Sequence, residues 1–240
     1  HSSMKAIGET QKGADTVLDA LMEFFEKGLL LLPTHTWKTI NAENPVFDVD
    51  NEPACVGILS NLFLKRPGVI RSLHPTHSMA GYGKDAASYL AGEEMRNTPC
   101  TPGGCYDRLK DVGGKILLVG VGHERNTYIH SVEEVLNVPN RLSDMPVLMK
   151  IVKHGKKPVS VYMRKHYNSQ QPHISENFVK LNRAFDECGA TVHTVFGSAE
   201  CILCDARRIF EVTRHVLAPD PECLVTGGEI APERWQELIK

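Results

Sequence analysis

The sequence has no apolar run long enough for a membrane helix, which needs about 20 consecutive apolar residues. Its first residues also lack the charged and then apolar pattern of a secretory signal. Neither sign of charge is in excess, because the net charge is −2 with eleven histidines counted as neutral. A nucleic-acid-binding domain usually carries a basic patch, so this balance argues against one. We therefore expect a protein that binds neither a membrane nor nucleic acid.

Several catalytic and cofactor signatures are missing as well. No serine lies in a G-x-S-x-G elbow, and no G-x-G-x-x-G follows a predicted strand, so nothing indicates a nicotinamide cofactor. The seven cysteines are odd in number and scattered, which favours reduced thiols in the cytoplasm. Cys201 and Cys204 form one C-x-x-C pair, but the second pair of a zinc site is absent, so we predict structural thiols there.

The composition present is that of an ordinary globular protein, with 42% hydrophobic and 23% charged residues in a chain of 240. Apolar spacing and turn residues predict an alternation of helices and strands through most of the chain. We expect helices at 15–27, 53–63, 85–90, 126–136, 175–188 and 205–217, and strands at 29–32, 69–70, 116–121, 147–152, 159–163 and 191–196. This order predicts an α/β fold, a single domain with a central mixed sheet flanked by helices.

The most informative stretch runs from residue 115 to residue 136. An apolar run predicts a buried strand, Gly120 and Gly122 allow a sharp turn, and a helix follows that Asn126 or Thr127 could cap. On that helix His130 and Glu133 are three residues apart and share one face. A carboxylate bound to one imidazole nitrogen fixes the tautomer and leaves the other nitrogen available as a base. This pair is our candidate catalytic centre, at the carboxyl end of a strand where open α/β sheets bind ligands.

Two other groups of residues are candidate functional sites on the basis of the sequence alone. Cys100 and Cys105 lie in a loop rich in proline and glycine, and His130 could activate either thiol, as in a Cys-His hydrolase. His74 and His77 have a spacing that metal ligands use, although the proline between them places them in a loop. A metal-assisted amide hydrolase is therefore a second alternative.

Several fragments occur together in an order that resembles the aminoglycoside 3-N-acetyltransferase, or antibiotic N-acetyltransferase, family. They are HSSM at the start, LLPTHT, GILSNLFLKRPGVIRSLHPTHSMAGYG, NTPC, and KILLVGV followed by NTYIHSVEE. The resemblance covers residues 1 to about 142 and is thinner beyond Arg141. In this family HSS follows a first strand, so the resemblance implies that an N-terminal strand and helix, several tens of residues, are missing from this sequence. Residues 1–240 would then form a single domain of this type.

The resemblance implies transfer of an acetyl group from acetyl-CoA to the 3-amino group of the 2-deoxystreptamine ring of an aminoglycoside, a reaction that confers antibiotic resistance. The fold would differ from that of the common GNAT acetyltransferases. His130 matches the family's catalytic histidine and Glu133 its orienting partner, and Thr127 could donate to the developing oxyanion or the leaving sulfur. Acetyl-CoA would be the co-substrate, and no metal would be required. A homodimer is a candidate assembly.

The resemblance also suggests residues for the two substrates. The segments matching those that line CoA in the family contain small and hydroxyl residues and one cation: Ser2, Ser3, Met4, Arg71, Ser72, Ser78, Ala80, Gly81 and Gly83. A polycationic acceptor calls for acidic side chains, and our candidates are Asp107, Glu124, Glu134 and Asp205. The segment TPCTPGGCYDRL departs from the family pattern, so the wall of the acceptor site is expected to differ. Two further alternatives are an acetyltransferase that acts on another amine and an inactive CoA-binding protein.

Overall fold

The computed structural model describes residues 1–239, which form two compact units. Unit 1 comprises residues 1–7, 100–143 and the segment from His166 to the end of the described part. Unit 2 comprises residues 8–99 and 144–165. Helices and strands occur in both units, which confirms the α/β class, whereas the single-domain assignment stays a prediction. No helix within residues 1–239 is both long enough and apolar enough to cross a membrane.

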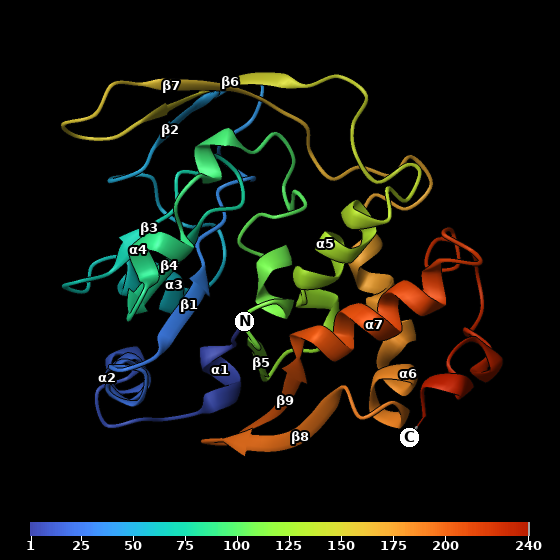
Figure 1. Ribbon diagram of the computed structural model, residues 1–240. Coiled ribbons are helices and arrows are strands. Elements are labelled where there is room, and N and C mark those ends of the chain that lie inside the picture. The colour runs from blue at the N-terminus through green and yellow to red at the C-terminus, as the bar shows by residue number, and fades with distance from the viewer. Residues whose placement is uncertain (240) are drawn as a thin grey trace. The chain divides into compact units, whose positions relative to one another are not determined.

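Unit 1 is built on the antiparallel sheet β5-β9-β8. Its strands are β5 (Lys115–Val119), β8 (Thr191–Phe196) and β9 (Ala199–Asp205). Its α-helices are α1 (Met4–Ile7), α5 (Tyr128–Val135), α6 (Asn182–Glu187) and α7 (Ala206–Leu217), and its 3₁₀ helices are η2 (Asp107–Lys110), η3 (His123–Arg125), η4 (Ile174–Leu181), η5 (Pro232–Arg234) and η6 (Gln236–Leu238). Helix α7 packs against α5 and α6, as Figure 1 shows.

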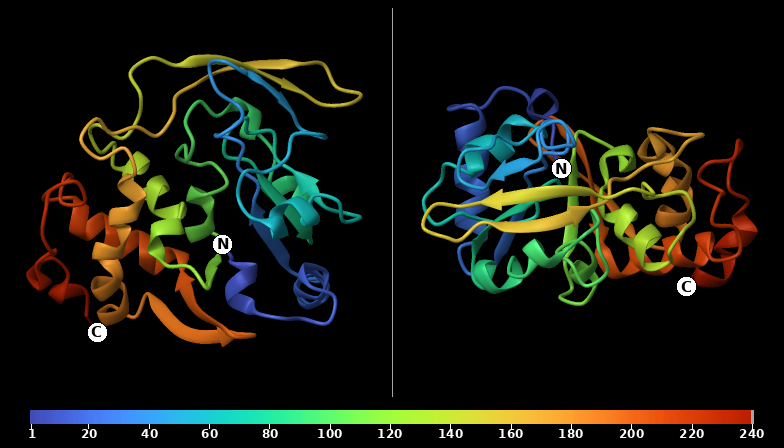
Figure 2. Two further views of the ribbon diagram at one scale, coloured as in Figure 1. Left: turned by 180° about the vertical axis from the view of Figure 1, so that it is seen from behind. Right: turned by 90° about the horizontal axis from the view of Figure 1, so that it is seen from above.

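Unit 2 contains two more three-stranded sheets, β1-β4-β3 and β2-β6-β7. Their strands are β1 (Leu29–Pro33), β2 (Val46–Asp48), β3 (Ile70–Arg71), β4 (Met79–Gly83), β6 (Val147–Val152) and β7 (Val159–Met163), and the helices are α2 (Ala14–Phe24), α3 (Ile58–Phe63), α4 (Ala86–Tyr89) and η1 (Glu93–Met95). Strands β6 and β7 form a long hairpin, seen from above in Figure 2, and β2 pairs with β6 in parallel. The predicted single central sheet is therefore replaced by three small sheets.

Three of the observed strands, β2, β4 and β9, were not predicted. Strand β4 lies in a segment rich in glycine, serine and histidine, residue types more typical of a loop. Gly81 allows β4 to pack closely, because a Cβ there would lie 2.9 Å from Leu90 Cδ1 and 3.1 Å from Leu31 Cδ2. Strand β9 contains Cys201 and Cys204, which are both buried and free. A purely structural role for these two thiols stays a prediction.

The stretch that leads to the candidate centre folds as the sequence indicates. Strand β5 is buried at Ile116, Leu118 and Val119. It pairs with β9 along one edge, and residues 1–3 form hydrogen bonds with its other edge. Gly120 turns the chain with φ +62°, and a Cβ at this position would overlap the side chain of Ala6. The 3₁₀ helix η3 follows, and α5 begins at Tyr128, with Thr127 at its N-cap position but without a side-chain capping bond. A buried strand and the turn after it thus fix the position at which the chain enters α5.

Candidate active site

His130 and Glu133 lie on the same face of α5, as their spacing predicts. His130 Nδ1 and Glu133 Oε2 are 2.8 Å apart, and the side chains are 11% and 1% exposed respectively. Burial alone would raise the pKa of Glu133, but the hydrogen bond and charge of His130 and the charge of Arg141 outweigh burial and lower the pKa. Because an ionised carboxylate can only accept, Nδ1 of His130 carries the proton. Its Nε2 is then the basic nitrogen.

Arg141 is the third member of this group, and the sequence analysis did not identify it. Its Nε donates to Glu133 Oε1 at 2.6 Å, and its side chain is 2% exposed. Its remaining donors reach the carbonyl oxygens of Pro139 and Pro221 and, at 3.4 Å, Glu222 Oε1. Arg141 therefore holds the Glu133 carboxylate in place. No sequence pattern marks it, because it lies eight residues beyond Glu133 in an irregular segment.

Two rings enclose the imidazole of His130. The ring of His166 is stacked on it with 4.0 Å between centroids, and Phe178 contacts it edge-on with centroids 4.8 Å apart. Burial lowers the pKa of His166, and repulsion from His130 adds to this, in spite of an opposing hydrogen bond to Glu134. A neutral His166 beside His130 provides an aromatic wall without adding a second positive charge. Spacing could not reveal this contact, because 36 positions separate the two histidines.

This geometry can perform proton transfer. A buried carboxylate, fixed by an arginine, orients an imidazole whose second nitrogen is available for a proton on a substrate. The same chain of contacts would support attack by an amine, a hydroxyl or a thiol. Comparison with known proteins selects among these reactions.

The family model for aminoglycoside 3-N-acetyltransferases matches residues 1–218. The chain belongs to this family. Aminoglycoside N(3)-acetyltransferase VII of Streptomyces paromomycinus is 26% identical to it, over 88% of this chain and 81% of that protein. Aminoglycoside N(3)-acetyltransferase IV of a Salmonella species is 27% identical, over 92% of this chain and 80% of that protein.

Solved structures of aminoglycoside acetyltransferases have the same fold. A histidine-to-alanine mutant of AAC(3)-IVa in complex with a gentamicin matches with a TM-score of 0.78 and 25% identity, over 100% of this chain and 89% of that one. AAC-IIIb with CoASH matches with a TM-score of 0.76 and 20% identity, over 91% and 88% of the two chains. These matches confirm the predicted antibiotic N-acetyltransferase fold.

Residues that the family resemblance suggests for CoA fall into both units. In unit 1, Ser2 forms a parallel bridge with Val119, and Ser3 donates its N–H to the Val119 carbonyl at 2.9 Å. Met4 begins α1. The Ser2 to Met4 segment therefore follows the carboxyl end of β5, the strand that leads toward the helix of His130.

The other residues predicted for CoA belong to β3, β4 and the loop between them in unit 2. Ser72 Oγ accepts the N–H of Met79, and Ser78 Oγ lies 2.7 Å from the Thr34 carbonyl oxygen. Ala80 and Gly81 are buried in β4, and Gly83 at its end has φ +96°. Their small side chains fit the packing of this sheet, so their composition does not by itself indicate a ligand.

Arg71 has a structural role that the sequence analysis did not foresee. Its side chain is buried, lies over the ring of Phe47, and donates to the carbonyl oxygens of Thr34 and Glu52 at 2.9 and 2.5 Å. Its Nε also donates to Ser78 Oγ at 3.1 Å. The guanidinium thus connects three segments of unit 2. Contact with a CoA phosphate stays a prediction, and these internal contacts do not support it.

The acidic residues predicted for the acceptor have different surroundings. Asp107 is buried, accepts the N–H of Gly103 and forms an ion pair with Lys110 at 2.5 Å. Asp205 caps α7 by accepting the N–H of Arg208 and forms an ion pair with Lys115. Both carboxylates are balanced by a lysine within unit 1. Such partners lower their value as binding groups for a cation.

Glu124 and Glu134 are placed differently. Glu124 is half-buried, and its Oε1 accepts the N–H of Gly122 at 3.0 Å, just after β5. Glu134 follows the His130–Glu133 pair on α5, and its Oε1 lies 2.9 Å from His166 Nε2. Both residues are thus in the same part of unit 1 as the candidate base, although their binding of an acceptor stays a prediction.

The proposed metal pair of the loop 73–78 is not supported. His74 Nδ1 accepts the backbone N–H groups of Thr76 and His77 at 3.2 and 2.9 Å, and its Nε2 lies 3.0 Å from the Thr98 carbonyl oxygen. Because both ring nitrogens are engaged with backbone groups, His74 orders its own loop instead of offering a lone pair to a metal ion. Cys105, the other alternative, is buried with its sulfur 3.8 Å from Arg108 Nη2.

Proposed function

We propose that this protein transfers the acetyl group of acetyl-CoA to the 3-amino group of the 2-deoxystreptamine ring of aminoglycosides, with His130 as general base. Membership of the family supports the reaction type, and its named relatives act on this position. The single structural observation that carries the proposal is the buried contact of His130 with Glu133, at 2.8 Å. A dyad of this kind can accept the proton that an amine must lose before it attacks a thioester.

The proposed mechanism assigns one task to each member of the group. An aminoglycoside amine is protonated at neutral pH and must lose a proton before it can attack a thioester, and His130 Nε2 accepts that proton. Glu133 and Arg141 are positioning residues, because they fix the tautomer and stabilise the imidazolium that forms. Acetyl-CoA supplies the activated acetyl group, and CoA leaves as the thiol. These steps assign no task to a metal ion.

Thr127 is the candidate for stabilising negative charge. It directly precedes α5, one turn before His130, and its hydroxyl makes no capping bond to the helix. A hydroxyl donor near the base suits an oxyanion or a departing thiolate. We assign this role to Thr127 as part of the proposal.

Arg71→Ala tests what the predicted CoA residues do. Because the substitution leaves buried carbonyl oxygens without their donor, it is expected to lower the free energy of unfolding on the order of 1–3 kcal/mol. Urea unfolding measures this change, and calorimetry with CoA on the folded variant measures affinity. The family resemblance predicts weaker CoA binding as well. If CoA affinity is unchanged while stability falls, Arg71 is purely structural.

Salt dependence tests the polycationic acceptor. Acidic side chains that hold a polycation are screened by salt, so the KM for the aminoglycoside is expected to rise with ionic strength more steeply than the KM for acetyl-CoA. Steady-state kinetics at several NaCl concentrations, with a neutral osmolyte as control, give both values. An acceptor KM that does not change with salt would indicate a neutral or weakly charged substrate.

A panel of acceptors with acetyl-CoA tests the proposed function itself. The panel contains aminoglycosides with a 2-deoxystreptamine ring and simple polyamines, and free thiol release and mass spectrometry follow each reaction. Thiol release that depends on the amine, together with a gain of one acetyl group by an aminoglycoside, supports the proposal. Acetylation of polyamines alone would indicate another amine substrate. Thiol release without an acceptor would indicate hydrolysis, and no release would indicate an inactive CoA-binding protein.

A cytoplasmic location of the protein is also part of the proposal. The seven cysteines lie among the described residues and none forms a disulfide, which agrees with the reducing cytoplasm, where acetyl-CoA is available. A homodimer stays a prediction.

A further inference from the structure

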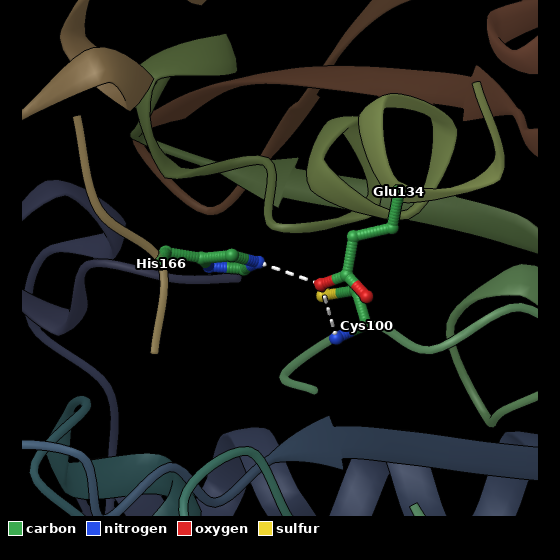
Figure 3. A group of neighbouring side chains, drawn as sticks. All are labelled: Cys100, Glu134 and His166. Carbon is green, nitrogen blue, oxygen red and sulfur yellow. Dashed lines mark hydrogen bonds and ion pairs between the residues drawn. The ribbon is translucent and has the colours of Figure 1, made fainter. Parts of the chain in front are cut away.

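A second group of side chains lies beside the dyad in unit 1. Cys100 comes from the loop before η2, Glu134 from α5 and His166 from the segment after β7, and Figure 3 shows the three converging. The sulfur, a carboxylate oxygen and an imidazole nitrogen all lie within 4.8 Å of one another. Glu134 Oε1 accepts the backbone N–H of Cys100 at 2.8 Å and is 2.9 Å from His166 Nε2. Three residues distant in sequence thus place three different ligand atoms at one point.

We propose that Cys100, Glu134 and His166 bind a zinc ion. A thiolate, a carboxylate and an imidazole nitrogen are all ligands that Zn²⁺ uses, and three protein ligands with one open position are typical of an accessible zinc site. The sulfur and the nitrogen select against Mg²⁺ and Ca²⁺, which prefer sets composed of oxygen. It is the only group of this kind found among residues 1–239.

The distance between the oxygen and nitrogen ligands is close to the one that a bound ion needs, whereas the sulfur is known to lie within 4.8 Å of both. Ligand atoms about 2.0 Å from a tetrahedral zinc ion are about 3.3 Å apart, as follows from the bond lengths and the tetrahedral angle. The 2.9 Å between Glu134 Oε1 and His166 Nε2 must therefore widen by only a few tenths of an ångström. Binding would also require two protons to move. The Cys100 thiol, now directed at the Thr127 carbonyl oxygen, must give its proton to solvent, and His166 Nε2 must lose the proton that it now donates to Glu134, so that the neutral ring is protonated at Nδ1 instead.

The three proposed ligand side chains are buried, which restricts their conformations before an ion binds. The side chains of Glu134 and His166 are 3% and 15% exposed, and Cys100 as a whole is 2% exposed. Few rotamers are available to side chains so enclosed, so less conformational entropy is lost when the ion binds. The most exposed member, His166, marks the side from which an ion can enter.

The zinc site lies beside the proposed base. The ring of His166, one of its ligands, is stacked on that of His130 with 4.0 Å between the ring centroids. The zinc site does not rest on the proposed function, because it is argued from Cys100, Glu134 and His166 alone.

Metal binding is tested on the purified, chelator-treated protein without substrates. Competition with a chromophoric chelator measures zinc affinity and stoichiometry, and Co²⁺ replaces Zn²⁺ for absorption spectroscopy. The wild type is expected to bind one zinc ion and to give Co²⁺ a sulfur charge-transfer band with the intense visible bands of a tetrahedral ion. Cys100→Ser should abolish the charge-transfer band and weaken zinc binding by more than about 10-fold, since even residues behind the ligands cost that much. Cys105→Ser removes another buried thiol of the same loop and should retain both properties.

Further measurements distinguish failure of the zinc site from failure of the proposed function. His166→Gln should also weaken zinc binding, and circular dichroism shows whether this variant is folded. It replaces Cys100→Ser in the test if Cys100→Ser does not fold. Equal zinc affinity in the wild type and in both ligand variants would overturn the site. Zinc binding without any turnover would support the site and contradict only the proposed function.

Discussion

His130→Ala is expected to lower kcat by about 10²- to 10⁴-fold, the usual contribution of a positioned general base. The reason is the proton of the acceptor amine, which no other group in the dyad can accept, because the lone pairs of Glu133 are engaged by His130 and Arg141. Steady-state kinetics with saturating acetyl-CoA and an aminoglycoside measure the effect. CoA affinity is expected to change little, since the imidazole acts on the amine.

A matched control uses another histidine of unit 1. The side chain of His193 on β8 is 64% exposed and forms an ion pair with an exposed aspartate, so His193→Ala is expected to keep the wild-type kcat. Glu133→Gln is expected to reduce kcat less than His130→Ala does, because the amide preserves the geometry but weakens control of the tautomer. Near wild-type turnover by His130→Ala at neutral pH would refute the assignment, and Cys100 would then be the next candidate.

Arg141→Ala is expected to lower the free energy of unfolding by about 3–5 kcal/mol, because it leaves the buried Glu133 carboxylate without its arginine. The side chains of both residues are at most 2% exposed, so water cannot replace the lost partner. Urea unfolding measures the change, and kcat should fall as the carboxylate moves away from His130. Arg183→Ala, which breaks an exposed pair with Glu187, is the control and should change the unfolding midpoint little.

A double variant separates charge burial from simple loss of packing. Adding Glu133→Gln to Arg141→Ala removes the unpaired charge, so the double variant should be more stable than Arg141→Ala alone. If the double variant is instead less stable by the sum of the two single effects, the ion pair is not what stabilises this region.

The same pair gives stability a pH dependence of known sign. The pKa of Glu133 is lowered in the folded protein, so the folded state binds this proton more weakly than the unfolded state does. The resulting stabilisation is fully present above the unfolded pKa of about 4.3 and is lost as pH falls through the lower, folded value. Urea midpoints measured across the acid range should therefore fall less steeply in Glu133→Gln than in the wild type.

Local patterns in the sequence predicted what depends on local structure. The apolar run of β5, the turn at Gly120 and the spacing of His130 and Glu133 are all set within about 20 residues, and the structure confirms them. The hairpin β6–β7 and helix α7 are likewise predictable from periodicity and turn residues. The fold class follows from these elements.

Contacts between distant segments could not be predicted in this way. Arg141 reaches Glu133 from an irregular segment, and His166 stacks on His130 from beyond the β6–β7 hairpin, so neither leaves a periodic signal. The internal contacts of Arg71 were not foreseen for a related reason: a cation near small hydroxyl residues suits a phosphate, but its burial also makes the carbonyl oxygens of its own unit acceptors. The three small sheets likewise depend on pairings that hydrophobic alternation does not specify.

The position of the acetyl group on the product tests the central claim most directly. An aminoglycoside with a 2-deoxystreptamine ring is incubated with acetyl-CoA and either the wild type or His130→Ala, and the purified product is analysed by two-dimensional NMR. We predict a single acetyl group, on the 3-amino nitrogen, with the wild type, and essentially none over the same time with His130→Ala. An acetyl group on another nitrogen, or equal product from both proteins, would contradict the account.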